Sequence, residues 1–173
     1  MDENISKYKY HEKWMKEALK LAKKALDAKE FPVGCVLVKD DKVVGIGNRI
    51  NSYGFNHNEL DHAEILALKD ALNRHYSVKN AVAYTTLEPC LMCLGALVIS
   101  GVEKIVYAYE DVMGGACNMN FSNENLLYKD IKKKFIPYVL RQDSLYLFKK
   151  FFSDPTNNYL SGTLLKEYTL NQS

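Results

Sequence analysis

Two short motifs contain the residue types best suited to bind a metal ion. They are HAE, residues 62–64, and PCLMC, residues 89–93. Cys90 and Cys93 stand three residues apart at the start of a predicted helix, so both sulfurs project to one side. The positive end of the helix dipole favours their thiolate forms. Two thiolates do not complete a metal site, and His62 is the candidate third ligand.

A metal ion held by His62, Cys90 and Cys93 keeps a fourth coordination position for water, as catalytic rather than structural zinc sites do. Zinc lowers the pKa of its bound water to about 7, which makes hydroxide available at neutral pH. Glu64 follows the histidine by two residues and can carry a proton to a leaving group without binding the metal. The pattern therefore predicts one zinc ion per chain and hydrolytic deamination, with Glu64 as the catalytic residue and ammonia as the product.

Other interpretations of these residues stay open at this stage. Cys35 or Cys117 could complete a structural zinc site, although Cys35 stands in an apolar strand and is typical of a core. The CxxC pair could do redox chemistry, but the HAE motif would then have no role. Glu64 could be an ordinary solvated helix residue. Asp61 is better explained as the cap of a helix than as a ligand.

With these motifs in place, the chain resembles the cytidine/deoxycytidylate deaminase superfamily, whose zinc enzymes share the order H-x-E…P-C-x-x-C. Within that superfamily it is most similar to the bacterial tRNA adenosine deaminases, which make inosine at the anticodon wobble position. The similarity runs from about His11 to Ala116. It includes the segments HEKWMKEALKLAKKALDAKEFPVGCVLV, GNR, HAEILALK and TLEPCLMCLGALVISGVEKIVYAYED.

The resemblance implies a fold, a partner and a set of substrate contacts. The fold is a three-layer α/β/α arrangement of the cytidine-deaminase type, with a mixed five-stranded sheet and helices on both faces. The partner is a second copy, in a homodimer formed across the PCxxC helix and the strand and loop that follow it. From the residues alone, Asn48 would be a turn residue at the end of a strand. The implied substrate-binding residues are Asn48, Phe31, Val33, Ala63, Glu88, Pro89 and Asp111.

Several departures from the tRNA enzymes bear on the substrate. Glu110 precedes Asp111 where those enzymes usually carry a basic residue, and the loop at 50–61 is longer than usual. The tail beyond Phe152 has no counterpart in the short tRNA enzymes, whereas a C-terminal segment helps to cover the active site in related guanine deaminases. Such a cover suits a small free base or nucleoside and obstructs an anticodon loop.

Three functional hypotheses follow, and deamination of adenosine at the tRNA wobble position comes first. The second is a deaminase of a free nucleobase, nucleoside or nucleotide that is guanine-, adenine- or cytidine-like, supported by the tail and by Glu110. The third is an inactive zinc-bearing RNA-binding module, against which the intact Glu64 argues. Lys132–Lys134 offer cations to an RNA loop, although a lysine run is more often a solvated helix face.

The elements that position these motifs follow from the hydrophobic pattern. Residues 11–30 have helical periodicity, and residues 33–49 predict a β-hairpin that turns at Asp40-Asp41. Pro89 suits the first position of a helix, and Asp143 or Ser144 is the expected cap of a later one. Strands alternating with helices after an initial hairpin predict an α/β sandwich. Further strands are predicted at residues 80–87, 104–109 and 135–140, and further helices at 62–74, 89–100, about 126–133 and 143–152.

Bulk composition limits the remaining possibilities. A chain of 173 residues is long enough for one well-buried core, and no repeat or linker divides it. We expect a deaminase domain at 1–153 and a tail at 154–173 that packs on the domain or on the dimer partner, with a frayed end as the alternative. The net charge of +2 permits a nucleic-acid partner without arguing for one. Four cysteines are too few for a disulfide framework and no apolar run spans a bilayer, so we expect a cytoplasmic location without a membrane.

Overall fold

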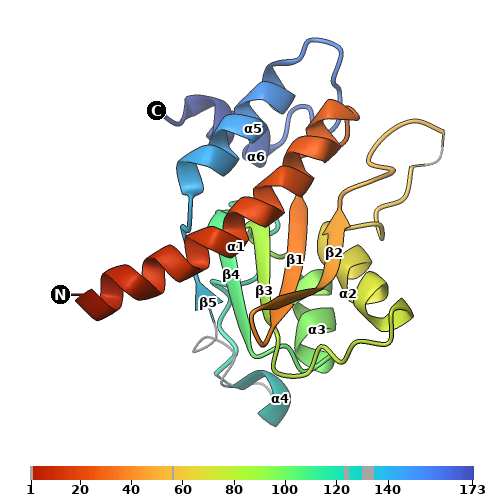
Figure 1. Ribbon diagram of the computed structural model, residues 1–173. Helices are drawn as coiled ribbons and strands as arrows, with labels where there is room; N and C mark the ends of the chain where they lie inside the picture. The colour runs from red at the N-terminus through yellow and green to blue at the C-terminus, as the bar shows by residue number, and fades with distance from the viewer. Residues whose placement is uncertain (1, 56, 123–124, 130–134) are drawn as a thin grey trace.

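A mixed five-stranded sheet forms the centre of the molecule. The computed structural model describes residues 2–173 apart from 56, 123–124 and 130–134. The strands are β1 (Gly34–Lys39), β2 (Lys42–Asn48), β3 (Val82–Leu87), β4 (Lys104–Tyr109) and β5 (Phe135–Ile136). They lie in the order β2-β1-β3-β4-β5 (Figure 1). β1 is antiparallel to both of its neighbours, and the β3-β4 and β4-β5 pairs are parallel.

Helices cover both faces of this sheet, which confirms the expected three-layer α/β class (Figure 1). α1 (Asp2–Asp27) crosses one face, where its Met15 and Ala18 are fully buried. α2 (Ala63–Asn73) and α3 (Leu91–Ile99) belong to the larger core on the opposite face. None of the helices in the described part of the chain combines the length and the apolar character that a bilayer crossing requires.

The start of α2 is held unusually close to β2. A Cβ atom on Gly47 would lie 2.1 Å from the carbonyl oxygen of Ala63 and 2.6 Å from the backbone nitrogen of Ala67. Only a residue without a side chain permits this approach. The close contact brings the first turn of α2, which includes Glu64, against the sheet.

The C-terminal part of the chain forms a helical layer at one end of the sheet. α5 (Arg141–Ser153) and α6 (Leu164–Asn171) lie side by side beyond the end of β4 (Figure 1). Leu165 is only 1% exposed and belongs to the main core. The hydroxyl groups of Tyr109 and Thr169 are hydrogen-bonded at 3.1 Å, which ties α6 to β4.

Some predicted boundaries are corrected by the structure. α1 starts at Asp2 rather than at His11, because no proline or glycine precedes His11 to interrupt the helix. The short helix predicted at about 126–133 is described as α4 (Leu126–Lys129), and residues 130–133 lie outside the described residues. The strand predicted at 135–140 stops after β5, since Tyr138 and Leu140 have φ angles of 66° and 55°, which a strand cannot contain.

Two predicted helix starts are also wrong, those of α5 and α3. Leu140 is the N-cap of α5, and Ser144 is buried and donates its hydroxyl to the Thr86 carbonyl at 2.6 Å instead of capping the helix. Asp143 lies in the first turn rather than at the cap. Pro89 precedes α3 by two residues, because the extended backbone of Cys90 occupies the N-cap position between them.

Candidate active site

His62, Cys90 and Cys93 come together in the folded chain. The Nδ1 atom of His62 lies 3.6 Å from the sulfur of Cys90 and 3.4 Å from the sulfur of Cys93. The three ligand atoms all lie within 4.8 Å of one another, and no fourth residue of the described chain joins this group. Cys35 and Cys117 are buried outside it.

The local backbone explains why these side chains are free to meet. His62 and Cys90 are the N-cap residues of α2 and α3, each with extended dihedral angles. Neither side chain makes the hydrogen bond by which serine, threonine or aspartate would cap a helix. The prediction that Asp61 caps α2 is therefore wrong, and its carboxylate instead accepts hydrogen bonds from Asn51 and Asn58, both at 2.8 Å.

Glu64 lies beside the cluster in the first turn of α2 and is 3% exposed. Its Oε1 atom accepts a hydrogen bond from the hydroxyl of Thr85 at 2.8 Å, and its Oε2 atom lies 3.4 Å from the sulfur of Cys93. Burial raises the pKa of Glu64, because the charged carboxylate loses its hydration there. A carboxyl group beside a metal cluster can accept and release a proton during a reaction.

The contacts within the cluster shift the pKa values of the two thiols and of the imidazole in different directions. Hydrogen bonding from Cys93 and from His62 lowers the pKa of Cys90 to about 4. The same contact with Cys90, together with burial, raises the pKa of Cys93. The hydrogen bond with Cys90 also raises the pKa of His62. A bound cation would displace these shared protons, as ligation of thiols and imidazole requires.

The cluster lies in the wall of a cavity of about 230 Å³. This volume is below the roughly 300–1,000 Å³ of sites that hold drug-sized ligands. Apolar side chains form much of the wall, and four carboxylates share it with a single arginine among the described lining residues. The apolar lining residues include Phe31, Val33, Leu87, Leu160 and Leu165, and the charged ones are Arg49, Glu59, Glu64, Glu88 and Asp111.

The predicted substrate contacts divide into two groups. Asn48 and Pro89 are not among the lining residues. The side-chain amide of Asn48 donates to the carbonyl of Arg49 at 3.1 Å, and the carbonyl of Pro89 accepts from the backbone nitrogen of Ala116 at 2.9 Å. The residues that do line the cavity are Phe31, Val33, Ala63, Glu88 and Asp111.

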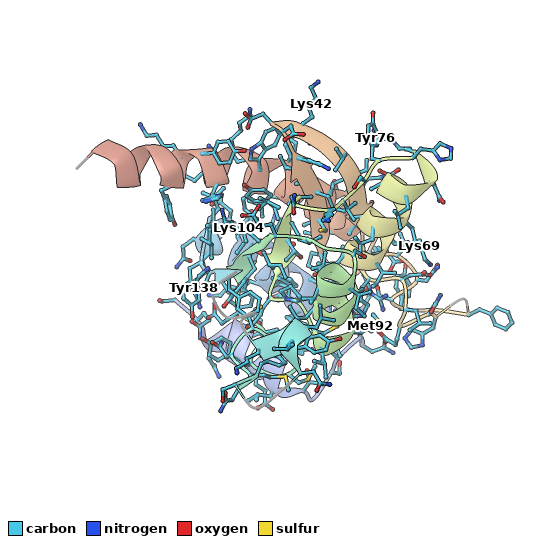
Figure 2. All side chains as sticks on the ribbon, turned by 90° about the horizontal axis from the view of Figure 1, so that it is seen from below. Lys42, Lys69, Tyr76, Met92, Lys104 and Tyr138 are labelled. Atoms are coloured by element: carbon cyan, nitrogen blue, oxygen red, sulfur yellow. The ribbon has the colours of Figure 1, made fainter. Side chains whose placement is uncertain are left out.

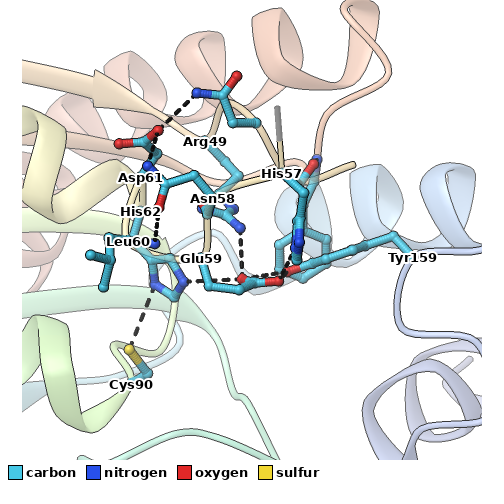
Figure 3. A network of polar contacts seen from close by, with 12 residues as sticks. Arg49, His57, Asn58, Glu59, Leu60, Asp61, His62, Cys90 and Tyr159 are labelled. Carbon is cyan, nitrogen blue, oxygen red and sulfur yellow. Dashed lines mark hydrogen bonds and ion pairs between the residues drawn. The ribbon is translucent and has the colours of Figure 1, made fainter. Parts of the chain in front are cut away.

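Other lining residues were missed by the sequence analysis. Arg49 and Glu59 form an ion pair at 2.7 Å, and the Tyr159 hydroxyl donates to the same carboxylate at 3.1 Å (Figure 3). His57 contacts Glu59 at 2.6 Å. Arg49 stands in the GNR segment, which gave a partial signal. No local pattern connects residue 59 with residue 159.

Comparisons with known proteins agree with this geometry. A family model described as MafB19-like deaminase matches residues 9–139. The chain belongs to this family, within the cytidine deaminase superfamily. The deaminase is 31% identical over 156 residues to a Xenopus tropicalis protein named tRNA-specific adenosine deaminase 2, with 84% of this chain and 90% of the relative covered.

Two further relatives have similar names. A Streptococcus pyogenes tRNA-specific adenosine deaminase is 34% identical over 119 residues, covering 67% of this chain and 69% of the relative. A solved chain from work on A-to-I editing by tRNA:A34 deaminases at the wobble position has a TM-score of 0.62 and 25% identity. The match covers 78% of this chain and 97% of the solved chain. The predicted superfamily and its likeness to tRNA adenosine deaminases are thereby confirmed.

Glu88 organises one side of the cavity in this deaminase. The buried carboxylate accepts hydrogen bonds from the backbone nitrogens of Cys117 at 2.9 Å and Asp111 at 3.2 Å. A Cβ atom on Gly115 would lie 2.5 Å from the Glu88 carboxyl carbon, so the loop passes very close to this side chain. Glu88 thus holds the loop at 111–117 against the strand end, in addition to facing the cavity.

Replacing Glu88 tests this structural role. Glu88→Ala leaves the buried N–H of Cys117 and the part-buried N–H of Asp111 without acceptors. A buried unpaired N–H costs about 1–3 kcal/mol. We expect the free energy of unfolding, measured by urea denaturation, to fall by at least about 1 kcal/mol. Glu103→Ala is the control, since Glu103 is exposed and its carboxylate, within the described part of the chain, forms an ion pair with Lys104 alone. Equal unfolding midpoints for the two variants would contradict the anchoring role.

Proposed function

We propose that this chain is a zinc-dependent hydrolytic deaminase, which replaces a ring amino group of a nucleobase by a carbonyl and releases ammonia. One observation carries the proposal. A histidine and two cysteines converge within bonding reach of one metal ion, and the buried carboxyl group of Glu64 adjoins them in the wall of a small cavity. Membership of a deaminase family supports the same reaction.

The donor set fits zinc. Zinc binds cysteine sulfur at about 2.3 Å and histidine nitrogen at about 2.0–2.1 Å, and tetrahedral angles then separate the two donor atoms by about 3.6 Å. The distances from His62 Nδ1 to the two sulfurs are 3.6 and 3.4 Å. Three protein ligands leave one position for solvent, as in catalytic zinc sites. Zinc held by these three ligands would lower the pKa of a bound water molecule to near neutral.

The chain's own residues would handle the protons and the base. Glu64 takes a proton from the attacking water and delivers it to the amino nitrogen, so that the ring carbon gains oxygen, the C–N bond breaks and ammonia leaves. Thr85 fixes one carboxyl oxygen of Glu64 and leaves the other facing the cluster. Phe31, Val33 and Leu87 provide apolar surface for the faces of a planar ring.

Two substrate candidates remain, each supported by a different observation. Adenosine at the tRNA wobble position is supported by the named relatives. A free base or nucleoside is supported by the tail, because Tyr159, Leu160 and Leu165 line the cavity. The lysines at 132–134, which could contact RNA, lie outside the described residues.

Metal content tests the ligand set. We expect the purified wild-type protein to contain one zinc ion per chain by elemental analysis. Cys93→Ala should contain almost none, because two ligands hold zinc far less tightly than three. Cys117→Ala is the matched control, since its thiol lies outside the cluster and its loss should leave the zinc content unchanged. Zinc retained in Cys93→Ala would refute the assignment.

Activity tests the role of Glu64. Ammonia release should be measured on a panel of free bases and nucleosides beside a tRNA with adenosine at the wobble position. Glu64→Gln preserves size and one hydrogen bond but cannot carry the proton, so turnover should fall by about 10²–10⁴-fold. Zinc content and thermal stability should stay near those of the wild type. Undiminished turnover by Glu64→Gln would exclude the proton-carrying role. If the wild-type protein releases ammonia from no substrate of the panel, the inactive RNA-binding module is favoured instead.

A homodimer is part of this proposal. Leu91, Met92 and Ile99 expose apolar side chains on α3, and Met92 is seen at the surface in Figure 2. Met119 and Leu126, which follow in sequence, are also exposed. Large apolar side chains gathered at a surface are typical of protein interfaces. The cytoplasmic location expected from the sequence belongs to the same proposal.

Sedimentation velocity tests the dimer. Leu91→Glu would bury a charge in the proposed interface, so we expect it to shift the protein towards the monomer. Leu72→Glu is the matched control, because Leu72 on α2 has the same exposed fraction of 55% as Leu91. Identical sedimentation of both variants and the wild type would contradict an interface on α3.

A further inference from the structure

The segment that joins α5 to α6 forms one side of the cavity. Tyr159, Leu160 and Leu165 line it together with residues of the sheet and of α2. The ring centroid of Tyr159 lies 5.4 Å from that of Phe31. The Tyr159 hydroxyl donates at 3.1 Å to Glu59, which belongs to the loop before α2 (Figure 3). The tail therefore closes the pocket by both ring packing and a hydrogen bond.

A second set of contacts holds the far end of this segment. Glu110 accepts a hydrogen bond from Arg141 Nε at 2.8 Å and another from the Tyr168 hydroxyl at 2.7 Å. A second guanidinium nitrogen of Arg141 also donates to Glu110, so the pair is bidentate. The same nitrogen donates to the side chain of Gln172 at 3.0 Å. Glu110 thus joins β4 to α5 and α6, and half-buried bidentate pairs of this kind are among the stronger ion pairs.

The contacts of Glu110 with Arg141 and Tyr168, here called the clamp, explain why this chain has an acidic residue where the tRNA enzymes usually have a basic one. The carboxylate does not line the cavity but fixes the helices that bring Leu165 to it. Burial alone would raise the pKa of Glu110, but the donors Arg141 and Tyr168 outweigh burial and lower it, which keeps the carboxylate charged. A basic residue at this position would repel Arg141.

The charges of the lining do not suit a polyanion. Carboxylates from Glu59, Glu64, Glu88 and Asp111 face the cavity, and Arg49 is the single lysine or arginine among the described lining residues. Arg49 is already occupied, since its terminal nitrogens donate to the Asn58 carbonyl at 3.0 Å and to Glu59 at 2.7 Å. Binding of an RNA backbone requires unpaired cations near the phosphates.

Among the described lining residues, no lysine or arginine is therefore left unpaired to meet a phosphate group. The Nε atom of Arg49 has no hydrogen-bond partner in the described part of the chain, but it has essentially no exposed surface and does not reach the cavity. The lining thus combines apolar surface with acidic groups.

From these contacts we propose that the tail restricts this deaminase to uncharged monomers, namely free nucleobases or nucleosides. Tyr159 and Leu165 are assigned as substrate-contacting residues, and Glu110 and Arg141 as positioning residues that hold them. The inference rests on the proposed function and names the substrate class of the same site.

Steady-state kinetics on two substrate classes test the inference. The wild-type zinc protein should have a kcat/KM on its best free base or nucleoside at least tenfold above that on an anticodon stem-loop RNA with adenosine at the wobble position. Tyr159→Ala should raise KM for the monomer about tenfold, while zinc content stays at one per chain. Tyr159→Phe keeps the ring and loses the hydroxyl, so its KM for the monomer should lie between those of the wild type and Tyr159→Ala. Equal monomer KM in Tyr159→Ala and wild type would overturn the contact.

Amide hydrogen exchange tests the clamp without any substrate. Glu110→Gln should speed exchange in residues 164–172 and raise the monomer KM with little change in kcat. Glu103→Gln, the same substitution at an exposed residue directly before β4, should change neither. Unchanged exchange in Glu110→Gln would refute the positioning role.

The outcomes separate this inference from the proposed function. If the stem-loop RNA is deaminated as well as or better than every monomer, the restriction to monomers is overturned while the deaminase function stands. If the zinc-loaded wild type releases no ammonia from any substrate, the proposed function itself fails and the inference falls with it.

Discussion

The convergence of one imidazole and two thiols on a single point is the constraint on which the rest of this structure depends. His62 and Cys90 are the cap residues of two different helices, and both forgo the capping hydrogen bond that their positions normally make. They can meet only because α2 and α3 start side by side at the same end of the sheet. Gly47 makes this possible for α2, since any side chain there would push the helix away from β2.

Buried carboxylates form the second layer of the site, and each is held by a different kind of partner. Glu64 is fixed by the hydroxyl of Thr85 from the neighbouring strand and leaves one oxygen towards the cluster. Glu88 uses its two oxygens on backbone N–H groups of the following loop. These two buried glutamates, one in the first turn of α2 and one directly after β3, therefore serve opposite purposes. Glu64 keeps an oxygen directed to the cluster, whereas both oxygens of Glu88 are satisfied by the protein itself.

The C-terminal part of the chain is joined to the cavity region by two contacts. Tyr159 donates to Glu59 at the edge of the cavity, and Glu110 binds Arg141 and Tyr168 from the end of β4. Both contacts join residues that are distant in sequence, and both use a carboxylate at the edge of the site. The cavity is thus built both from residues that the family model matches, 9–139, and from the tail that follows them.

The sequence by itself determined the elements whose signals are local. The spacing of Cys90 and Cys93 predicts one face of a helix start, and the two apolar runs around Asp40-Asp41 predict the hairpin. HAE followed by PCxxC predicts the metal ligands, and the structure brings those ligands together. Tertiary structure alone decided the helix caps, because the backbone of Leu140 and the burial of Ser144 depend on packing against β3. It also decided the roles of Arg49, Glu59 and Tyr159, since an ion pair or hydrogen bond between residues far apart in the chain leaves no periodicity in the sequence.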